Sequence, residues 1–153
     1  PLAHLAIPAT AGTGSEATSI AVMYVEGKKH SLDHPALLPE AVILDPDLLA
    51  SLPLYHKKSC ALDALCQGIE SYWARKATED SQVDAFLAFT GVLDNLRPYL
   101  AGDPGAAAEI QFAAYRSGCA IAVSRTTAKL QTEIRRQTGV IFPADGVNVE
   151  AVA

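Results

Sequence analysis

The sequence predicts an α/β segment followed by a mostly α-helical domain, and three observations support this fold class. The first 45 of the 153 residues contain short β-branched and apolar runs separated by Gly and Pro. Beyond Pro53, apolar residues recur at the three- and four-residue spacing of amphipathic helices. Residues 45–53, where the pattern changes, are the candidate domain boundary.

Three stretches of the first segment are predicted strands. Residues 4–10 (HLAIPAT) run into a glycine-rich loop, and residues 19–25 (SIAVMYV) end at a Glu26-Gly27 turn. Residues 41–44 (AVIL) are the third candidate strand. We expect these strands to lack part of their sheet, and exposed strand edges favour aggregation.

Four helices are expected in the remainder of the chain. Asp45 caps a short helix that has Pro46 at its first position and ends at Pro53. Thr78 is the predicted cap of the third helix, whose first turn is acidic. The three long amphipathic runs cover residues 56–75, about 81–96, and 103–127.

Composition excludes several classes of protein. Twelve basic and seventeen acidic residues give a net charge of -5, and no long basic face supports nucleic-acid binding. No apolar run approaches the roughly 20 residues that a membrane span needs. The three cysteines, Cys60, Cys66 and Cys119, form no CxxC pair, which is typical of reduced thiols in a cytoplasmic protein.

A glycine-rich loop, TAGTGSE, covers residues 10–16. Gly12 and Gly14 allow a ligand to approach the backbone closely, while Thr10, Thr13 and Ser15 supply hydroxyl groups. Such a loop can hold a phosphate or a ribose. A plain turn that joins two strands explains the same residues equally well.

Two phosphate-binding fingerprints do not fit this loop. The spacing of Gly12, Gly14 and Ala17 matches GxGxxA, but that fingerprint requires a helix directly after the glycines. Residues 18–25 favour a strand instead. A Walker A loop also fails, because no Lys follows the second glycine.

The first long helix carries a candidate metal site. Asp63, Gln67 and Glu70 stand at i, i+4 and i+7 and so share one helix face, among apolar neighbours. A carboxylate in such surroundings needs a cation or hydrogen bonds. A divalent metal held by Asp63 and the Gln67 carbonyl oxygen would supply the cation; capping or pairing with a backbone group is the alternative.

Three stretches, taken together and in order, resemble the iron-containing (group III) alcohol dehydrogenases. They are residues 8–18 (PATAGTGSEAT), 45–53 (DPDLLASLP) and 61–72 (ALDALCQGIESY), and the likeness covers roughly residues 5–128. Residues 31–35 (SLDHP), 62–67 (LDALCQ) and 120–128 (AIAVSRTTA) are most similar to the phosphonoacetaldehyde reductase branch.

The resemblance implies a dehydroquinate synthase-like, iron-type alcohol dehydrogenase fold that is incomplete at both ends. Residues 1–45 would be the C-terminal part of an NAD(P)-binding α/β domain and 46–128 part of the helical metal-binding domain; residues 129–153 form an unrecognised tail. In the family, a divalent iron or zinc ion polarises the alcohol or aldehyde oxygen during hydride transfer with NAD or NADP. The implied partners are a small aldehyde or alcohol and, for full-length members, a second copy in a homodimer.

The resemblance also implies site residues. Thr10, Gly12, Thr13, Gly14 and Ser15 would line the nicotinamide and pyrophosphate, with Thr18 and Lys29 at further cofactor contacts. Asp63 falls on the family's first metal ligand, and Gln67 replaces the His that is usually the second.

The expected third metal ligand, also a His, should fall near position 130, where this chain has Leu130. The fourth ligand would lie beyond the chain, as would the family's glycine-serine pyrophosphate motif. We therefore expect an oxidoreductase fragment that is inactive alone. The competing hypothesis is a non-catalytic helical binding module with a partial nucleotide loop.

Overall fold

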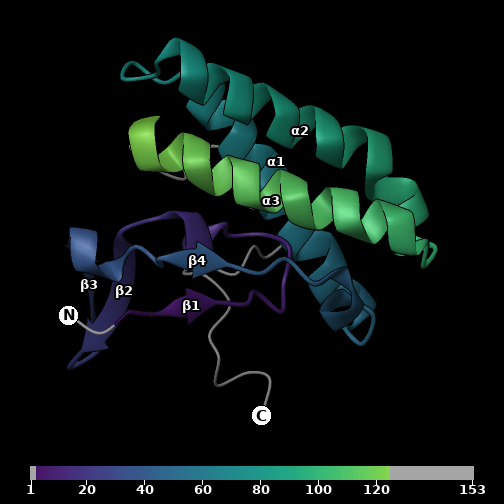
Figure 1. Ribbon diagram of the computed structural model, residues 1–153, viewed down its shortest axis with the longest axis horizontal. Coiled ribbons are helices and arrows are strands. Elements are labelled where there is room, and N and C mark those ends of the chain that lie inside the picture. The colour runs from purple at the N-terminus through teal and green to yellow at the C-terminus, as the bar shows by residue number, and fades with distance from the viewer. Residues whose placement is uncertain (1–2, 125–153) are drawn as a thin grey trace.

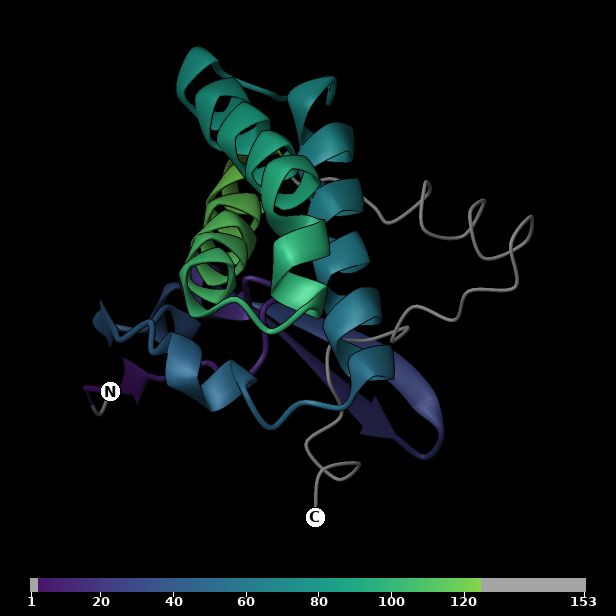
Figure 2. The same cartoon turned by 90° about the vertical axis from the view of Figure 1, so that its right-hand side faces the viewer.

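The computed structural model describes residues 3–124, and in it three long helices lie against a small group of strands (Figure 1). The helices are α1 (Leu54–Tyr72), α2 (Glu79–Leu100) and α3 (Pro104–Ser124). Each of the three packs against the other two, and the strands lie below the helices in both views (Figures 1 and 2). The predicted succession of an α/β segment and a helical segment is confirmed; the predicted tail, residues 129–153, lies outside the described residues.

The strands of the described part form two separate pairs. Strands β1 (Leu5–Ala6) and β4 (Ala41–Val42) are parallel, with Leu5 opposite Ala41. Strands β2 (Ile20–Val25) and β3 (Lys28–Asp33) form an antiparallel hairpin with Ile20 opposite Asp33. The two-residue turn between them, Glu26-Gly27, has both φ angles positive, as a tight right-twisted hairpin requires.

Strand β3 was missed by the sequence analysis. All six of its residues are exposed, so its sequence KKHSLD has no buried face and no apolar alternation to reveal it. The other strands were predicted, but β1 and β4 are shorter than expected because only two residues of each find a partner strand.

The helix starts follow the predicted capping chemistry. The Asp45 side chain accepts a hydrogen bond from the Asp47 amide at 3.1 Å and begins the 3-10 helix η3 (Pro46–Leu49). Thr78 begins α2 through a reciprocal pair of hydrogen bonds with Ser81. The predicted C-terminal ends of the helices were less accurate. Helix α1 ends at Tyr72, three residues before the predicted end, and α2 continues through Pro98 to Leu100.

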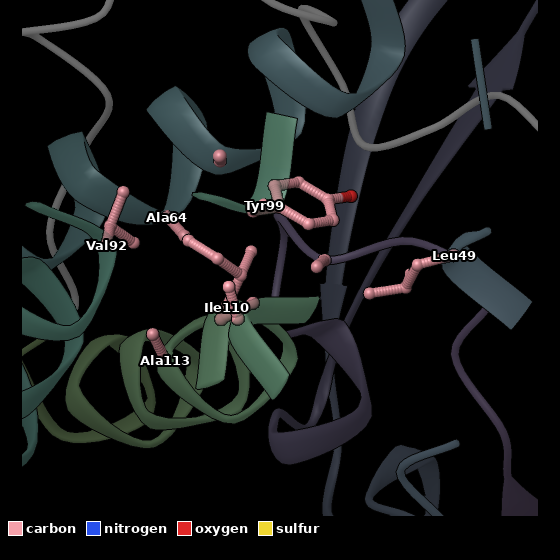
Figure 3. Packing of buried hydrophobic residues seen from close by; sticks show 10 residues of the cluster. Leu49, Ala64, Val92, Tyr99, Ile110 and Ala113 are labelled. Atoms are coloured by element: carbon pink, nitrogen blue, oxygen red, sulfur yellow. The ribbon is translucent and has the colours of Figure 1, made fainter. Parts of the chain in front are cut away.

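Small residues allow the three helices to approach closely. The buried core combines Ala61 and Ala64 of α1 with Val92 of α2 and Ile110 of α3, and Leu49 of η3 joins it from the strand side (Figure 3). Because alanine fills so much of the interface, a few larger side chains carry much of the apolar burial. The core therefore sits between the helices and reaches the strand segment through η3.

Replacing Ile110, which is fully buried, with alanine should lower the free energy of unfolding by about 2–5 kcal/mol, since the surrounding helices can collapse only partly onto the cavity. Leu93→Ala on α2 is the matched control, because Leu93 is 59% exposed and its truncation should change stability by only about 0.5 kcal/mol. Urea unfolding followed by circular dichroism measures both. Equal losses for the two variants would contradict the assigned core.

Candidate functional site

The TAGTGSE loop joins β1 to β2 and lies against helices α1 and α3. It is closed by local hydrogen bonds: the Thr13 hydroxyl donates to the Ser15 hydroxyl at 3.2 Å, and the Ser15 amide donates to the Thr13 hydroxyl at 3.3 Å. Ser15 is exposed, so the polar side of the loop is open to a ligand. A short 3-10 helix, η1 (Ser15–Ala17), follows and leads directly into β2. This three-residue turn begins directly after Gly14 and is not a long α-helix, and the strand expected over residues 18–25 is confirmed as β2.

The two loop glycines face protein. A Cβ atom on Gly12 would lie 2.9 Å from Cys60 of α1, closer than real Cβ contacts. A Cβ on Gly14 would lie 2.6 Å from the Gly118 backbone of α3, and Gly14 has the left-handed φ of +58° that favours glycine. Close packing of the loop between two helices therefore requires both glycines, a reason that the sequence did not reveal.

The buried side chain of Gln111 on α3 forms hydrogen bonds to the segments that follow β1 and β4. The Gln111 side-chain amide donates to the carbonyl oxygens of Pro8 at 3.2 Å and Asp45 at 3.3 Å. These two carbonyls follow β1 and β4, respectively. Gln111 is only 1% exposed, and its own carbonyl oxygen has no hydrogen-bond partner among the described residues.

Helix α1 presents the candidate metal ligands as predicted, on one face. Asp63 and Glu70 are buried and Gln67 is half-buried. Burial is the main reason that the pKa of the Cys60 thiol rises to about 11 and that of the Cys66 thiol to about 12. The carboxylate of Asp63 adds to the rise at Cys60, and those of Glu70 and Asp63 add to the rise at Cys66. Both cysteines are therefore protonated and act as small buried apolar groups.

Gln67 already has a partner on α3. The hydroxyl of Ser117 lies 3.0 Å from Gln67 Oε1 and 2.7 Å from the Ala114 carbonyl oxygen. The Ser117 hydroxyl is the donor, and Gln67 Oε1 and the Ala114 carbonyl oxygen are the two acceptors within its reach. This polar contact joins α1 and α3 at Gln67, the residue expected from the sequence to be the second metal ligand.

Among residues 3–124, the side chains do not form a complete divalent metal site. In the described part of the chain, no group of three or more His, Cys, Asp or Glu side chains is placed to hold an ion. Asp63 and Gln67 supply two oxygen donors, whereas such sites use about three or four protein ligands. Leu130, at the expected position of the third ligand, lies outside the described residues.

Most of the predicted cofactor-binding residues lie in or beside the glycine-rich loop, whereas Lys29 lies away from it. Thr18 is buried beside the loop, and its hydroxyl donates to the Ser15 carbonyl at 3.0 Å; Thr10 is half-buried at the loop's start. Lys29 is exposed on β3 opposite Tyr24, near the hairpin turn. Four residues of strand, about 13 Å, separate this position from the hairpin base at Ile20.

The sequence analysis missed three polar or small residues of α3: Gln111, Ser117 and Gly118. A signal was present, because Gln111, Ala114 and Gly118 stand at i, i+3 and i+7 and so lie on one face of the helix. The pattern resembles any helix–helix contact, and only the structure shows that a loop lies against it.

A family model and individual relatives both relate this chain to the alcohol dehydrogenases. The sequence model of the iron-containing alcohol dehydrogenases matches residues 1–46. A phosphonoacetaldehyde reductase of Streptomyces viridochromogenes is 39% identical over 80% of this chain and 32% of its own length. A long-chain-alcohol dehydrogenase of Geobacillus thermodenitrificans is 34% identical over 78% of this chain and 31% of its own.

Solved structures share the fold. An iron-containing alcohol dehydrogenase from Thermococcus thioreducens has a TM-score of 0.77 and 34% identity over 79% of this chain and 32% of that one. Sulfoacetaldehyde reductase from Bifidobacterium kashiwanohense, solved with NAD+, has a TM-score of 0.83 and 28% identity over 92% and 39%. The chain spans about a third of the length of these relatives.

None of the helices in residues 3–124 is both long enough and apolar enough to cross a membrane.

Glu16 in the loop provides a pH test of this arrangement. Burial raises the pKa of its carboxyl above 4.5, so folding favours the protonated form. The stability that this group contributes is complete below pH 4.5 and is lost as the pH rises through the raised pKa. Between pH 4 and 7, the wild type should therefore lose unfolding free energy relative to Glu16→Gln.

The exposed Glu40 supplies the control, since Glu40→Gln removes the same charge away from the helices. Urea titrations of the three proteins across this pH range measure the differences. Parallel curves for the wild type and Glu16→Gln would contradict the burial of Glu16.

Proposed function

This chain belongs to the iron-containing alcohol dehydrogenase family, and from that premise we propose that it carries the cofactor loop and part of the active-site helix of an NAD(P)-dependent oxidoreductase. The reaction would interconvert a small aldehyde and its alcohol. One observation carries the proposal: the glycines of the TAGTGSE loop are packed against α1 and α3, whereas Ser15 stays exposed. A rigid loop with an open polar side suits a bound dinucleotide.

The proposed substrate is a short aldehyde with an anionic group, phosphonoacetaldehyde among them. The support comes from two relatives, one named a phosphonoacetaldehyde reductase and the other a sulfoacetaldehyde reductase. In the reduction, NAD(P)H would transfer hydride to the carbonyl carbon, and the carbonyl oxygen would take a proton, giving the alcohol and NAD(P)+. Within this chain, the loop would position the cofactor.

We further propose that these 153 residues do not catalyse this reaction by themselves. The family supplies a metal ion to polarise the substrate oxygen, but Asp63 and Gln67 are too few ligands to hold one. The sequence contains no His after His56, so no imidazole follows Asp63 to complete the set. Iron and zinc are the family's metals, and we expect neither to bind stoichiometrically here.

A second function, that of a non-catalytic helical binding module, has one observation in its favour. The contact between Gln67 and Ser117 joins α1 and α3 where a metal ligand would be expected. That contact gives Gln67 a structural use that needs no ion. Nucleotide binding by the loop separates the two functions, because the second predicts a stable fold that binds no nucleotide.

Nucleotide binding should be measurable on the purified chain by titration calorimetry with NADH and NADPH. Ser15→Ala should weaken binding about fivefold, because an exposed hydroxyl of the loop contributes about 1 kcal/mol through a hydrogen bond. Ser51→Ala, an exposed serine of the turn before α1, is the matched control and should bind as the wild type does. A folded chain that binds neither nucleotide would overturn the cofactor assignment.

Catalysis is tested separately, by following NAD(P)H absorbance with acetaldehyde or phosphonoacetaldehyde in the presence of Fe²⁺ or Zn²⁺. We expect no turnover above the protein-free blank. Gln67→His should not restore it, because two protein ligands still fall short of a closed site. Turnover together with one bound metal ion per chain would show that the chain does have enough metal ligands and would overturn this proposal.

A further inference from the structure

We propose that one face of α3, made of Gln111, Ala114 and Gly118, positions the glycine-rich loop for the cofactor. We call these three residues the loop-contacting face. Gln111 and Gly118 are thereby positioning residues: they touch the backbone that would hold the nucleotide and not the nucleotide itself. The cofactor part of this inference rests on the function proposed above, whereas the positioning part rests on the contacts alone.

Gly118 and Gly14 are in mutual backbone contact. A methyl group on Gly118 would overlap the Gly14 carbonyl oxygen and would lie 2.7 Å from its carbonyl carbon. In the other direction, a methyl on Gly14 would overlap the Ala114 carbonyl oxygen. Neither neighbour is a flexible side chain that could move aside, so the loop itself must shift if either glycine gains a Cβ atom.

Gln111 holds the other end of the same region. It lies two helical turns before Gly118, and its amide donates to the carbonyls of Pro8 and Asp45. Both carbonyls follow the carboxyl ends of the parallel strands β1 and β4. In open α/β sheets, ligands bind outside this edge. One buried side chain therefore joins the two strand-end segments to α3.

The side-chain amide of Gln111 suits this position because it can donate two hydrogen bonds. Two backbone carbonyls need donors, which a carboxylate lacks and a thioether cannot supply. The buried Oε1 atom of Gln111 has no partner among the described residues, which is a cost that the two donated hydrogen bonds offset. Since the segment from Pro8 to Gly14 is bound at both ends, movement of α3 and of the loop should be coupled.

The experiment uses four variants of the full chain. Gly118→Ala adds a methyl between α3 and the loop, while Gly105→Ala makes the same change in the first turn of α3. There the methyl would meet only the end of the Asp103 side chain, at 3.2 Å. Gln111→Met removes the amide at nearly constant volume. Its control, Gln82→Met, removes a comparable 3.0 Å bond from a side-chain amide to the Tyr72 carbonyl.

Hydrogen exchange read by mass spectrometry is the primary readout. Gly118→Ala and Gln111→Met should raise exchange in peptides covering residues 8–18 and 45–52 by about tenfold, because loop opening no longer has to break these contacts. Peptides within residues 84–96 of α2 should keep wild-type exchange. The two control variants should leave the loop peptides unchanged.

A purely structural role in the bundle gives a different pattern, with faster exchange throughout α1–α3. That pattern in Gln111→Met, or unchanged loop exchange in both variants, would overturn the proposal. If Gly118→Ala does not fold, Gln111→Met decides alone, since it introduces no overlap.

Affinity for NADH is the second readout. Both variants should bind at least about tenfold more weakly than the wild type, because a shifted loop loses hydrogen bonds to the nucleotide, and one to two such bonds contribute about 1.5 kcal/mol or more. Wild-type affinity in both variants would overturn the cofactor part. A wild type that binds no nucleotide, with loop exchange still raised in the variants, would overturn the proposed function and leave the positioning role supported.

Discussion

The backbone contact between Gly14 and Gly118 is the constraint on which the rest of this structure depends. With no side chain on either residue, the loop carbonyl lies directly against α3, and Gly12 lets the same loop pack on Cys60 of α1. Loop, strand ends and helices are consequently fixed relative to one another, with Gln111 adding hydrogen bonds at the strand ends. Larger residues at these positions would separate the α/β segment from the helical bundle.

Helix α1 carries the two residues that the sequence analysis singled out as candidate metal ligands. Asp63, the expected first ligand, is buried on its helix face. Gln67, four residues later, is hydrogen-bonded to Ser117 of the neighbouring helix. A neutral amide with a protein partner adds no charge to balance the carboxylate and competes poorly for a divalent ion. The fold is that of the family, whereas the described residues bring together no group of three His, Cys, Asp or Glu side chains that could hold an ion.

The predictions from sequence agree best with the structure where interactions between residues close together in the chain decide the conformation. Asp45 and Thr78 cap their helices as predicted, because capping depends on a side chain and amides two or three residues away. Strand β3 shows the opposite case, since its fully exposed residues are strand only by virtue of pairing with β2. The extension of α2 through Pro98 to Leu100 likewise reflects packing of the helix end, with Tyr99 buried in the core, over local preference.

The sequence by itself determined the family, the succession of a strand-rich segment and a helical one, the polar loop and the shared face of Asp63 and Gln67, because these follow from motifs and from spacing along the chain. Only the tertiary structure decided why the loop glycines are glycines and which residues of α3 hold the loop. Residues 14 and 118 are far apart in sequence, so their contact leaves no periodic signal. Three-dimensional packing likewise decided that Gln67 meets Ser117, since the distance between two helix faces is set by the small side chains between them.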